Sequence, residues 1–520
     1  MPDSSSDTVL VQDFLEVSAQ RLPSKEALVC GERRLTYTEL NSKANRLANA
    51  LLSHGIKRND RVVICLKNCV ETVVGIFAIL KAGATFVVVN HSTKEDKLAY
   101  ILNNCRASAF LVEGGAAEKG LGAALLQNVP SLRFLVLTGG MAASQCTGHD
   151  RWLAFDTLLV EFPAIEPPRV NGDSDLACLI YTSGTTGDPK GVMSDHSNVI
   201  FAADSIISYL KNTESDIVIN VLPLSFDYGL YQLLMVFRFG GTLVLEQSFT
   251  YPAVILQRIE QERVTGFPGV PTIYAMLLPM DLSGFNLTSL RYLTNTAASL
   301  PVNHIEKLRR KFPQAAVFSM YGLTETKRTL YLPPAELDRR PGSVGIPIPG
   351  TEAWLEDEQG RRLGPGETGL LVVRGRHVMR GYWEAPEATA KRFRTDPTTG
   401  ERLCHTGDLF RQDPDGFFYF VGRSDDIIKS RGEKIAPKEV ENIIYGLRGV
   451  HAVAVIGVPD PLLGQAIKAF VVATDSTLTE KQVIAHCRAN LEDYMVPKVI
   501  VFCPELPQTT SGKIKKTGLS

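Results

Sequence analysis

Residues 181–192 read Tyr181-Thr182-Ser183-Gly184-Thr185-Thr186-Gly187-Asp188-Pro189-Lys190-Gly191-Val192, and the rest of the chain is organised around them. The apolar residues 176–180 before it have the length and composition of a buried strand. Glycines let backbone N–H groups turn toward a ligand, hydroxyls donate hydrogen bonds, and a lysine adds positive charge. The stretch therefore predicts a phosphate-binding loop, although an ordinary flexible loop can share its composition. Its candidate ligands are Thr182, Ser183, Gly184, Thr185, Thr186, Gly187 and Lys190.

This loop is not of the Walker A type, because the residues after Gly184 lack the Gly-Lys-Ser/Thr ending. Outward from it, apolar strand-like runs alternate with segments of helical periodicity. Helices are expected at 9–22, after the capping box of Thr36 and Glu39, and at 71–81. Strands are expected at 61–66, 86–90, 109–112, 134–138 and 176–182. Such alternation predicts an α/β fold with a largely parallel sheet.

The sequence pattern changes near Gly350. Short strands at 351–356, 369–374 and 416–421, separated by Gly, Pro and Asp turns, predict a β-rich subdomain on the large α/β body. After Gly422 the chain turns polar, and helix and strand patterns follow up to residue 491. We therefore expect a large N-terminal domain over 1–422 and a small mobile α+β domain over 423–520. The hinge is placed near Asp425.

Composition excludes several classes of function. The chain has 520 residues with 55 Lys and Arg against 56 Asp and Glu, so no overall positive charge indicates nucleic acid as a partner. The first residues are polar and acidic, unlike a signal peptide, and the apolar run 72–80 is too short to cross a membrane. Nine cysteines without a Cys-x-x-Cys pair fit a reducing compartment. We expect a cytoplasmic protein without a membrane partner.

Four further stretches combine glycine with polar side chains. Residues 319–325 hold Tyr321, Gly322, Thr324 and Glu325, which could stack on a base, contact phosphate and bind Mg²⁺, whereas loops of this kind are often only structural. Residues 295–299 contain Thr296. Asp408 could accept hydrogen bonds from ribose hydroxyls. The other two stretches are 422–434 and 508–514, and a lysine in a polar tail such as Lys513 is usually just solvated.

Taken in order, these stretches resemble the AMP-forming adenylating superfamily, which includes acyl-CoA synthetases, adenylation domains of peptide synthetases and firefly luciferase. The motifs are the loop at 181–191, Tyr-Gly-Leu-Thr-Glu at 321–325, Arg-Gly-Tyr-Trp at 380–383, His-Thr-Gly-Asp-Leu at 405–409, Gly-Arg-Ser-Asp-Asp at 422–426 and Thr-Ser-Gly-Lys-Ile at 510–514. The resemblance covers essentially the whole chain.

The resemblance implies a role for each matching residue. The loop from Thr182 to Lys190 would surround the β- and γ-phosphates of ATP, and Glu325 would help bind Mg²⁺. Tyr321, beside Gly322, would stack on adenine. The other implied roles are Thr324 at the α-phosphate, Asp408 and Arg423 at the ribose, Asp425 at the hinge, Lys513 as the catalytic lysine of adenylation, and Lys429 and Gly432 in the thioester-forming state.

The segment Leu222 to Gly229 indicates which acid is activated. Acyl- and aryl-CoA ligases of the superfamily usually have a histidine-containing segment here, whereas amino-acid-activating members have Phe-Asp, as in Phe226-Asp227. A carboxylate among apolar residues needs a partner, and a substrate ammonium group would be one. Alternatively, Asp227 caps the helix expected from Tyr228 onward.

Lys327 and Arg328 follow Glu325 and suggest an anionic group on the substrate, although they could instead pair with acidic side chains of the protein. The combination with Phe-Asp looks like stand-alone enzymes of macrolactam polyketide pathways that load a β-amino acid, such as one of the 3-methylaspartate type, onto an acyl carrier protein. The acceptor thiol would come from that carrier or from coenzyme A. A fatty- or aryl-acid CoA ligase and a non-catalytic sensor are the alternatives.

Overall fold

The computed structural model describes residues 10–140, 146, 149–182, 188–430, 433–461, 463–474, 477–509, 514–516 and 518–519. The chain divides into two compact units. The first unit comprises residues 1–268, 324–327 and 375–402, and the second comprises 269–323, 328–374 and 403–520. The domain boundary expected at residue 422 and the independent movement of residues 423–520 stay predictions.

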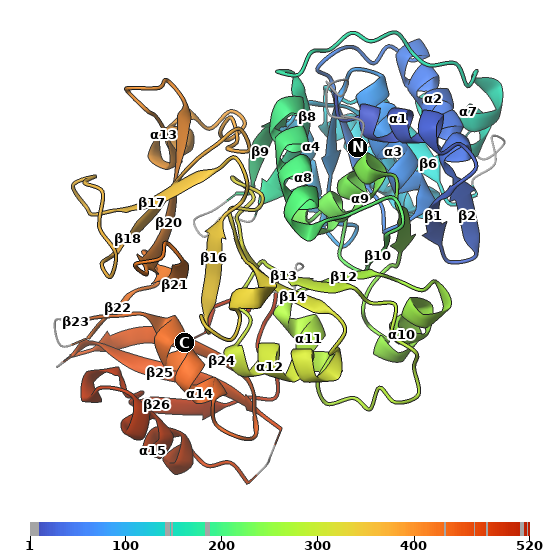
Figure 1. The fold of residues 1–520 in the computed structure, drawn as a ribbon. Coiled ribbons are helices and arrows are strands. Elements are labelled where there is room, and N and C mark those ends of the chain that lie inside the picture. The colour runs from blue at the N-terminus through green and yellow to red at the C-terminus, as the bar shows by residue number, and fades with distance from the viewer. Residues whose placement is uncertain are drawn as a thin grey trace. The chain divides into compact units, whose positions relative to one another are not determined.

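The first unit contains a seven-stranded sheet in the order β7-β6-β5-β3-β4-β8-β9, of which β6, β8 and β9 are labelled in Figure 1. All its pairs are parallel except β8 with β9. Buried apolar side chains such as Val63, Phe110 and Leu179 fill its core, as expected for strands covered on both faces. The strands are β3 (Arg61–Cys65), β4 (Thr85–Val88), β5 (Ala107–Glu113), β6 (Phe134–Thr138), β7 (Trp152–Ala154), β8 (Leu176–Thr182) and β9 (Lys190–Asp195).

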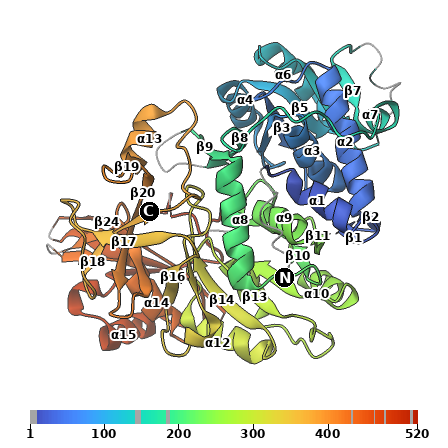
Figure 2. The same ribbon diagram turned by 45° about the horizontal axis from the view of Figure 1, so that its top comes forward.

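The first unit also contains the strand order β12-β10-β11-β1-β2. These strands are β1 (Glu26–Cys30), β2 (Arg33–Thr36), β10 (Ile217–Asn220), β11 (Thr242–Leu245) and β12 (Gly266–Gly269); β19 is Phe393–Thr395. Figure 2 shows the long helix α8 (His196–Leu210) beside α9 (Asp227–Phe239). The other helices are α1 (Asp13–Arg21), α2 (Tyr37–Ser53), α3 (Val70–Lys81), α4 (Glu95–Asn104), α5 (Gly114–Ala116), η1 (Ala117–Leu121), α6 (Gly122–Asn128), α7 (Phe155–Glu161), α10 (Pro252–Gln261) and α13 (Pro386–Arg392).

The capping box predicted before α2 is confirmed. The backbone N–H of Glu39 donates to Thr36 Oγ1 over 3.2 Å, and the N–H of Thr36 donates to the Glu39 carboxylate over 2.8 Å. The first predicted helix is shorter than expected and begins at Asp13, whose carboxylate accepts from the N–H of Leu10. A side chain that binds the backbone just before a helix fixes where the helix begins.

The second unit contains the strand order β17-β18-β20-β21-β16-β15-β14-β13, which includes the β-rich part predicted after Gly350. Its strands are β13 (Tyr292–Asn295), β14 (Ala316–Tyr321), β15 (Leu330–Leu332), β16 (Ser343–Pro347), β17 (Glu352–Glu356), β18 (Thr368–Arg374), β20 (Arg402–Gln412) and β21 (Phe418–Arg423). Its helices here are α11 (Pro271–Leu277), α12 (Val302–Lys311) and η3 (Pro334–Glu336).

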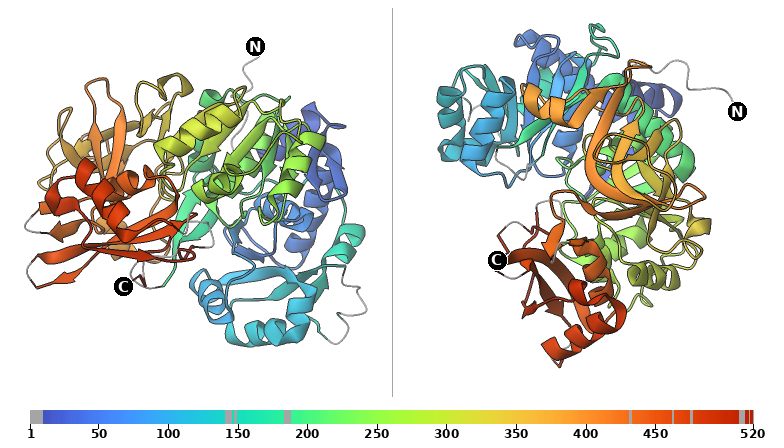
Figure 3. Two further views of the ribbon diagram at one scale, coloured as in Figure 1. Left: turned by 90° about the horizontal axis from the view of Figure 1, so that it is seen from below. Right: turned by 90° about the vertical axis from the view of Figure 1, so that its left-hand side faces the viewer.

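The C-terminal part of the second unit is a small sheet with helices, as predicted (Figure 3). Its order is β23-β22-β25-β24, and β26 pairs with β25. One apolar cluster lies between the sheet and helices α14 and α15, and a second involves Phe470, Leu506 and Ile514. The elements are β22 (Ile428–Ser430), β23 (Glu433–Ile435), α14 (Pro437–Tyr445), β24 (Val450–Asp460), β25 (Gly464–Ala473), α15 (Glu480–Asn490), η4 (Asp493–Met495) and β26 (Val499–Phe502).

No helix in the described parts of the chain combines the length and the hydropathy that a membrane span requires.

Candidate active site

The predicted phosphate-binding loop joins the antiparallel strands β8 and β9. Thr182 and Lys190 are direct partners in this ladder, so the two ends of the loop are held side by side. Five of its predicted ligands, Ser183, Gly184, Thr185, Thr186 and Gly187, lie outside the described residues. The strand pair places the Lys190 side chain at the end of the loop, where a lysine can reach a bound phosphate.

Tyr382 contacts two of the predicted site residues of the first unit. Its hydroxyl donates to Oε1 of Glu325 over 2.5 Å, and the Lys190 ammonium lies 5.7 Å from the centre of its ring. Tyr382 and Glu325 are 9% and 8% exposed, so this hydrogen bond is largely shielded from water. Tyr382 belongs to the motif Arg-Gly-Tyr-Trp, but no role for it was visible in the sequence because its partner Glu325 is 57 positions away.

The segment Thr324–Lys327 belongs to the first unit, although the residues on both sides of it belong to the second. Its last residue, Lys327, has a positive φ of 55° and a fully buried side chain. The Lys327 ammonium donates to Ser194 Oγ over 3.2 Å and lies 5.5 Å from the centre of the Tyr231 ring. A buried ammonium is stabilised by such polar and aromatic neighbours.

His377 is also buried in this region of the first unit. Burial lowers the pKa of His377, the nearby charge of Lys327 lowers it as well, and the two effects together bring it to about 3. The ring of Phe201 on α8 stacks with the His377 ring at 5.8 Å between ring centres. At neutral pH His377 is therefore uncharged, and Lys327 supplies the positive charge at this point.

Asp227 is the first residue of α9 and is 5% exposed. The N-cap position of this helix is held by Phe226, so Asp227 does not occupy the capping position that its alternative role requires. Tyr231 follows Asp227 by one helical turn and lies on the same helical face. Tyr231, one helical turn after Asp227 on α9, contacts the buried ammonium of Lys327.

In the second unit, Tyr321 and Asp408 are in direct contact. The Tyr321 hydroxyl donates to Asp408 Oδ2 over 2.6 Å, and burial followed by the charge of Asp408 raises the pKa of Tyr321 well above its ordinary value. The Tyr321 ring meets Phe410 edge-on at 4.8 Å and is stacked at 6.3 Å from Phe420. The predicted adenine and ribose residues therefore belong to one cluster.

Arg423 extends this cluster toward the predicted hinge. Asp408 on β20 is the direct ladder partner of Arg423 on β21, and Arg423 Nε lies 3.9 Å from Asp408 Oδ1. Arg423 Nε also donates to Asp425 Oδ1 over 3.2 Å. The Asp408 motif, predicted as a stretch that binds ribose, is part of a long strand, and Gly407 has the positive φ of 71° that favours glycine there.

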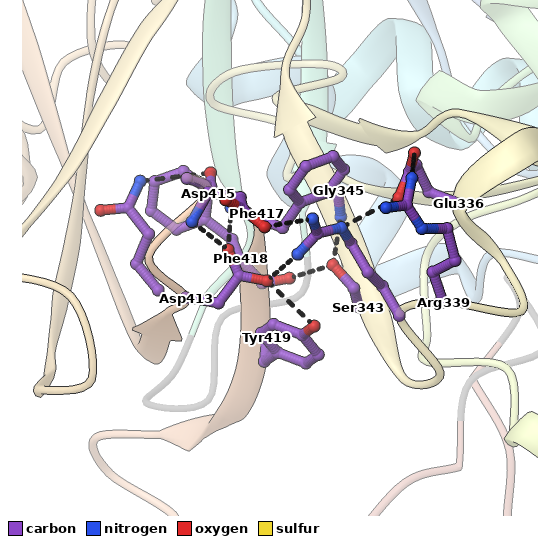
Figure 4. A network of polar contacts seen from close by, with 12 residues as sticks. Glu336, Arg339, Ser343, Gly345, Asp413, Asp415, Phe417, Phe418 and Tyr419 are labelled. Carbon is purple, nitrogen blue, oxygen red and sulfur yellow. Dashed lines mark hydrogen bonds and ion pairs between the residues drawn. The ribbon is translucent and has the colours of Figure 1, made fainter.

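Arg340 ties the turn between β20 and β21 to the segment before β16. Figure 4 shows the polar network at this turn, with Glu336, Asp413 and Asp415 labelled. Its guanidinium donates to Glu336 over 3.0 Å, to Asp415 over 2.6 Å and to Asp413, and it lies 3.9 Å from the centre of the Phe417 ring. The Ser343 hydroxyl donates to the carbonyl of Phe418 over 2.9 Å. These contacts hold the hairpin whose two strands carry Asp408 and Arg423.

Two other predicted substrate residues are buried in the second unit. Thr296, just after β13, is 2% exposed, and the following Ala297 has a positive φ of 75°. Arg328 is also 2% exposed and is the largest of the fully buried side chains among the described residues. Burial of an arginine requires polar partners nearby.

Gly322 and Thr324 lie in the loop that is closed by a hydrogen bond from the N–H of Thr329 to the carbonyl of Tyr321.

The predicted residues of the thioester-forming state are only partly described. Lys429 is on β22, and its N–H donates to the Gln465 side chain over 2.7 Å. Gly432 and Lys513 lie outside the described residues. The segment before and after Lys513 is anchored, because Gln508 bridges Ile514 and the Lys516 ammonium pairs with Glu441 at 2.7 Å.

Glu325 is the group of this site that suits a metal. The described part of the chain has no cluster of three or more His, Cys, Asp or Glu side chains that could hold an ion. Mg²⁺ commonly keeps several waters and binds through one or two carboxylates together with substrate phosphates. A single carboxylate at Glu325 therefore fits a Mg²⁺ ion that arrives with a nucleotide better than a resident metal.

A family profile described as AMP-binding enzyme matches residues 15–383, and a second, the AMP-binding enzyme C-terminal domain, matches residues 439–513. The chain belongs to the AMP-binding enzyme family. It is an adenylating enzyme, an AMP-forming ligase that activates a carboxylate substrate with ATP. Its mixed α/β fold with a large N-terminal body and a smaller C-terminal domain, expected from the sequence, is confirmed as that of adenylating enzymes.

Among curated relatives, a feruloyl-CoA synthase of Amycolatopsis is 35% identical, and the match covers 96% of each chain. One of the linear gramicidin synthase proteins of Brevibacillus parabrevis is 31% identical over 98% of this chain, which corresponds to 6% of that much longer protein. The adenylating enzyme is thus similar to a CoA ligase and to part of a peptide synthase.

Among solved structures, the anthranilate CoA ligase AuaEII in complex with anthranoyl-AMP superposes with a TM-score of 0.89, at 29% identity, covering 97% of this chain and 95% of the other. The Bacillus subtilis O-succinylbenzoate coenzyme A synthetase in complex with ATP and a magnesium ion has a TM-score of 0.82 at 28% identity, covering 96% of this chain and 98% of the other.

Proposed function

We propose that the acid activated by this adenylating enzyme is an amino acid with its amine in the β-position, and that its activated acyl group passes to the thiol of a carrier protein. The observation that supports the amino acid is the position of Asp227. A carboxylate with 5% exposure opens α9, one turn before Tyr231, whose ring contacts the Lys327 ammonium. A substrate that carries both an ammonium group and an anion would complement this arrangement.

Lys327 and Arg328 support the proposal of a second carboxylate on the substrate. Both side chains are buried, at 0% and 2% exposure, and arginine can bind a carboxylate through two parallel hydrogen bonds. An aspartate-like β-amino acid of the 3-methylaspartate type presents one ammonium group and two carboxylates. One carboxylate would react, and the other would face the cationic residues, as would be expected for complementary charges in a site of low dielectric.

In the proposed first half-reaction, an oxygen of the substrate carboxylate attacks the α-phosphorus of ATP. A bond forms between that oxygen and phosphorus, and the bond from phosphorus to the pyrophosphate oxygen breaks. Lys190 and the residues at 182–187 would hold the phosphates, Asp408 and Arg423 the ribose, and Lys513 would offset the negative charge that develops. Mg²⁺ bound with the nucleotide at Glu325 would supply further positive charge.

In the second half-reaction, the acceptor thiol loses its proton and its sulfur attacks the acyl carbon of the adenylate. The carbon–sulfur bond forms as the bond from carbon to the phosphate oxygen of AMP breaks, so AMP leaves. Lys429 and Gly432 would face the site in this state. The proposed acceptor is a phosphopantetheine arm on a carrier protein. Free coenzyme A is the second candidate, because the chain is similar to a feruloyl-CoA synthase.

The test is ATP–pyrophosphate exchange with a panel of α-amino, β-amino, fatty and aromatic acids. We expect exchange with a β-amino dicarboxylic acid and its loss in Asp227→Ala. Asp204→Asn, which removes an ion pair to Arg238 between α8 and α9, is the matched control and should retain exchange. Stimulation by fatty or aromatic acids and by no amino acid would refute the proposal and establish the acyl-CoA ligase alternative.

The acceptor is tested separately. Product release with coenzyme A is compared with loading of a purified carrier protein that bears a phosphopantetheine arm. Faster loading of the carrier supports the proposal, and exclusive formation of the CoA thioester contradicts it.

A further inference from the structure

Tyr382 is held in place by backbone hydrogen bonds on both sides. The N–H of Met193 donates to the carbonyl of Gly381 over 2.9 Å, and the N–H of Trp383 donates to the carbonyl of Gly191 over 2.7 Å. Tyr382 itself bridges Val192 of β9. The segment that carries Tyr382 is therefore attached to the strand that begins with Lys190.

The same segment is attached to Glu325. The N–H of Met379 donates to the carbonyl of Glu325 over 3.0 Å, while the Tyr382 hydroxyl donates to Oε1 of the Glu325 side chain. The Tyr382 N–H also donates to Thr389 Oγ1 over 3.0 Å, and Phe393 meets the Tyr382 ring at 5.8 Å between ring centres. Backbone and side chain thus fix the phenol with respect to the Glu325 carboxylate.

We propose that Tyr382 is a positioning residue for the metal–nucleotide complex. By holding Oε1 of Glu325, the phenol fixes the plane of the carboxylate, so that the carboxylate keeps one orientation toward an incoming cation. The ring face lies against the Lys190 ammonium and keeps this charge at the end of the phosphate loop. The Tyr382 side chain therefore holds both the carboxylate proposed to bind the metal and the lysine proposed to bind phosphate in position.

The inference rests on the proposed binding of ATP with Mg²⁺. Two substitutions separate the effects of the hydroxyl and of the ring of Tyr382. Tyr382→Phe removes only the hydroxyl, so Glu325 loses its hydrogen bond while the ring contact with Lys190 remains. Tyr382→Leu removes both. A hydrogen bond to a charged group is commonly equivalent to about a tenfold change in an equilibrium constant, sometimes more.

The experiment is calorimetric titration with a non-hydrolysable ATP analogue, in Mg²⁺ and in a chelator. We expect Tyr382→Phe to weaken binding of the Mg²⁺ complex about tenfold and to leave binding without metal unchanged within about twofold. Tyr382→Leu should weaken both. In a Glu325→Gln background, Tyr382→Phe should have no further effect, because the hydroxyl acts through that carboxylate.

Tyr37→Phe serves as the matched control. It removes a buried hydroxyl of the same unit, which donates to the carbonyl of Gly241 over 2.7 Å, and should leave nucleotide binding unchanged. If Tyr382→Phe weakens binding equally with and without metal, or weakens neither, the inference is overturned and the proposed function stands. If the wild-type protein binds the analogue equally with and without Mg²⁺ and shows no pyrophosphate exchange, the proposed function itself fails.

Discussion

The hydroxyl of Tyr321 donates a 2.6 Å hydrogen bond to Oδ2 of Asp408, although the two residues are 87 positions apart in the sequence. The contact joins the end of β14 to the middle of β20. A tyrosine predicted to stack on adenine is thereby connected to an aspartate predicted to accept from ribose hydroxyls. The hydrogen bond fixes the orientation of the carboxylate before a nucleotide arrives, so the side chain loses less conformational freedom on binding.

We first predict that Tyr321→Phe weakens ATP binding about three- to tenfold, because the ring remains but Asp408 loses its orienting hydrogen bond. Tyr321→Leu should weaken binding further, since the stacking surface is lost as well. Calorimetric titration with ATP measures both. Tyr274→Phe, which removes a 2.8 Å hydrogen bond to the carbonyl of Thr294 in the same unit, is the control. Equal affinities of Tyr321→Phe and wild type would contradict the role of the hydroxyl.

The second prediction concerns the C-terminal tail. Lys516 pairs with Glu441 on α14, and the N–H of Lys515 donates to the carbonyl of Pro507 over 2.7 Å, so the described residues after Lys513 are anchored to the small sheet. If Lys513 acts in adenylation, Lys516→Met should lower the maximal rate of pyrophosphate exchange about tenfold without changing KM for ATP, because a catalytic group loses its alignment.

Lys498→Met is the control for the tail, because it removes a different 2.6 Å ion pair, to Asp460, in the same small sheet. It should leave exchange unaffected, and Lys516→Arg should preserve most of the rate. A normal rate in Lys516→Met would show that this ion pair does not position the tail.

The third prediction is that Lys81→Met strongly destabilises the first unit. The side chains of Lys81 and Glu16 are 1% and 4% exposed and form an ion pair, and Arg169 also contacts Glu16. Removing one partner leaves a buried charge, which typically costs about 3–5 kcal/mol in the free energy of unfolding. The double variant Lys81→Met, Glu16→Gln should lose less stability.

Urea unfolding followed by circular dichroism measures the loss. The exposed pair of Arg21 and Glu214 provides the comparison, since Glu214→Gln should cost no more than about 1 kcal/mol. If Lys81→Met and Glu214→Gln were equally mild, the buried pair would contribute little to stability.

The fourth prediction is a loss of stability below neutral pH that depends on His196. Burial lowers the pKa of His196 to about 4, and its Nδ1 accepts a hydrogen bond of 3.0 Å from the N–H of Val11. The unfolded chain takes up a proton near the ordinary pKa of about 6.5, whereas the folded chain does not until about pH 4. Stability is therefore lost as the pH falls between these values, at up to about 1.4 kcal/mol per pH unit.

Denaturant unfolding of wild type and His196→Gln between pH 4.5 and pH 7.5 checks this. We expect the variant to be less stable at neutral pH but to show a shallower decline on acidification. Identical pH slopes in the two proteins would mean that His196 titrates normally in the folded state.

The sequence alone predicted most of the local structure and the order of the motifs. Alternating strands and helices, the capping box at Thr36 and the apolar runs such as residues 176–182 depend on neighbours a few positions away, so they can be seen in the sequence. Asp227 and Lys190 could also be named from the sequence as candidate binding residues, because a short motif shows which chemical groups it contains. Helix ends were less predictable, since a tertiary or side-chain contact often fixes them.

Which distant residues meet depends on how the chain packs in three dimensions. The hydrogen bond from Tyr382 to Glu325, the ring contact of Tyr231 with Lys327, and the hydrogen bond from Tyr321 to Asp408 join positions far apart in the chain. No periodicity encodes these pairs, because they arise from how strands and loops are packed around one another. The sequence determined which groups could bind a nucleotide and an acid. Packing determined which charged groups lie next to the same buried residue. In the interior the dielectric constant is low, so each of these contacts is stronger than it would be in water.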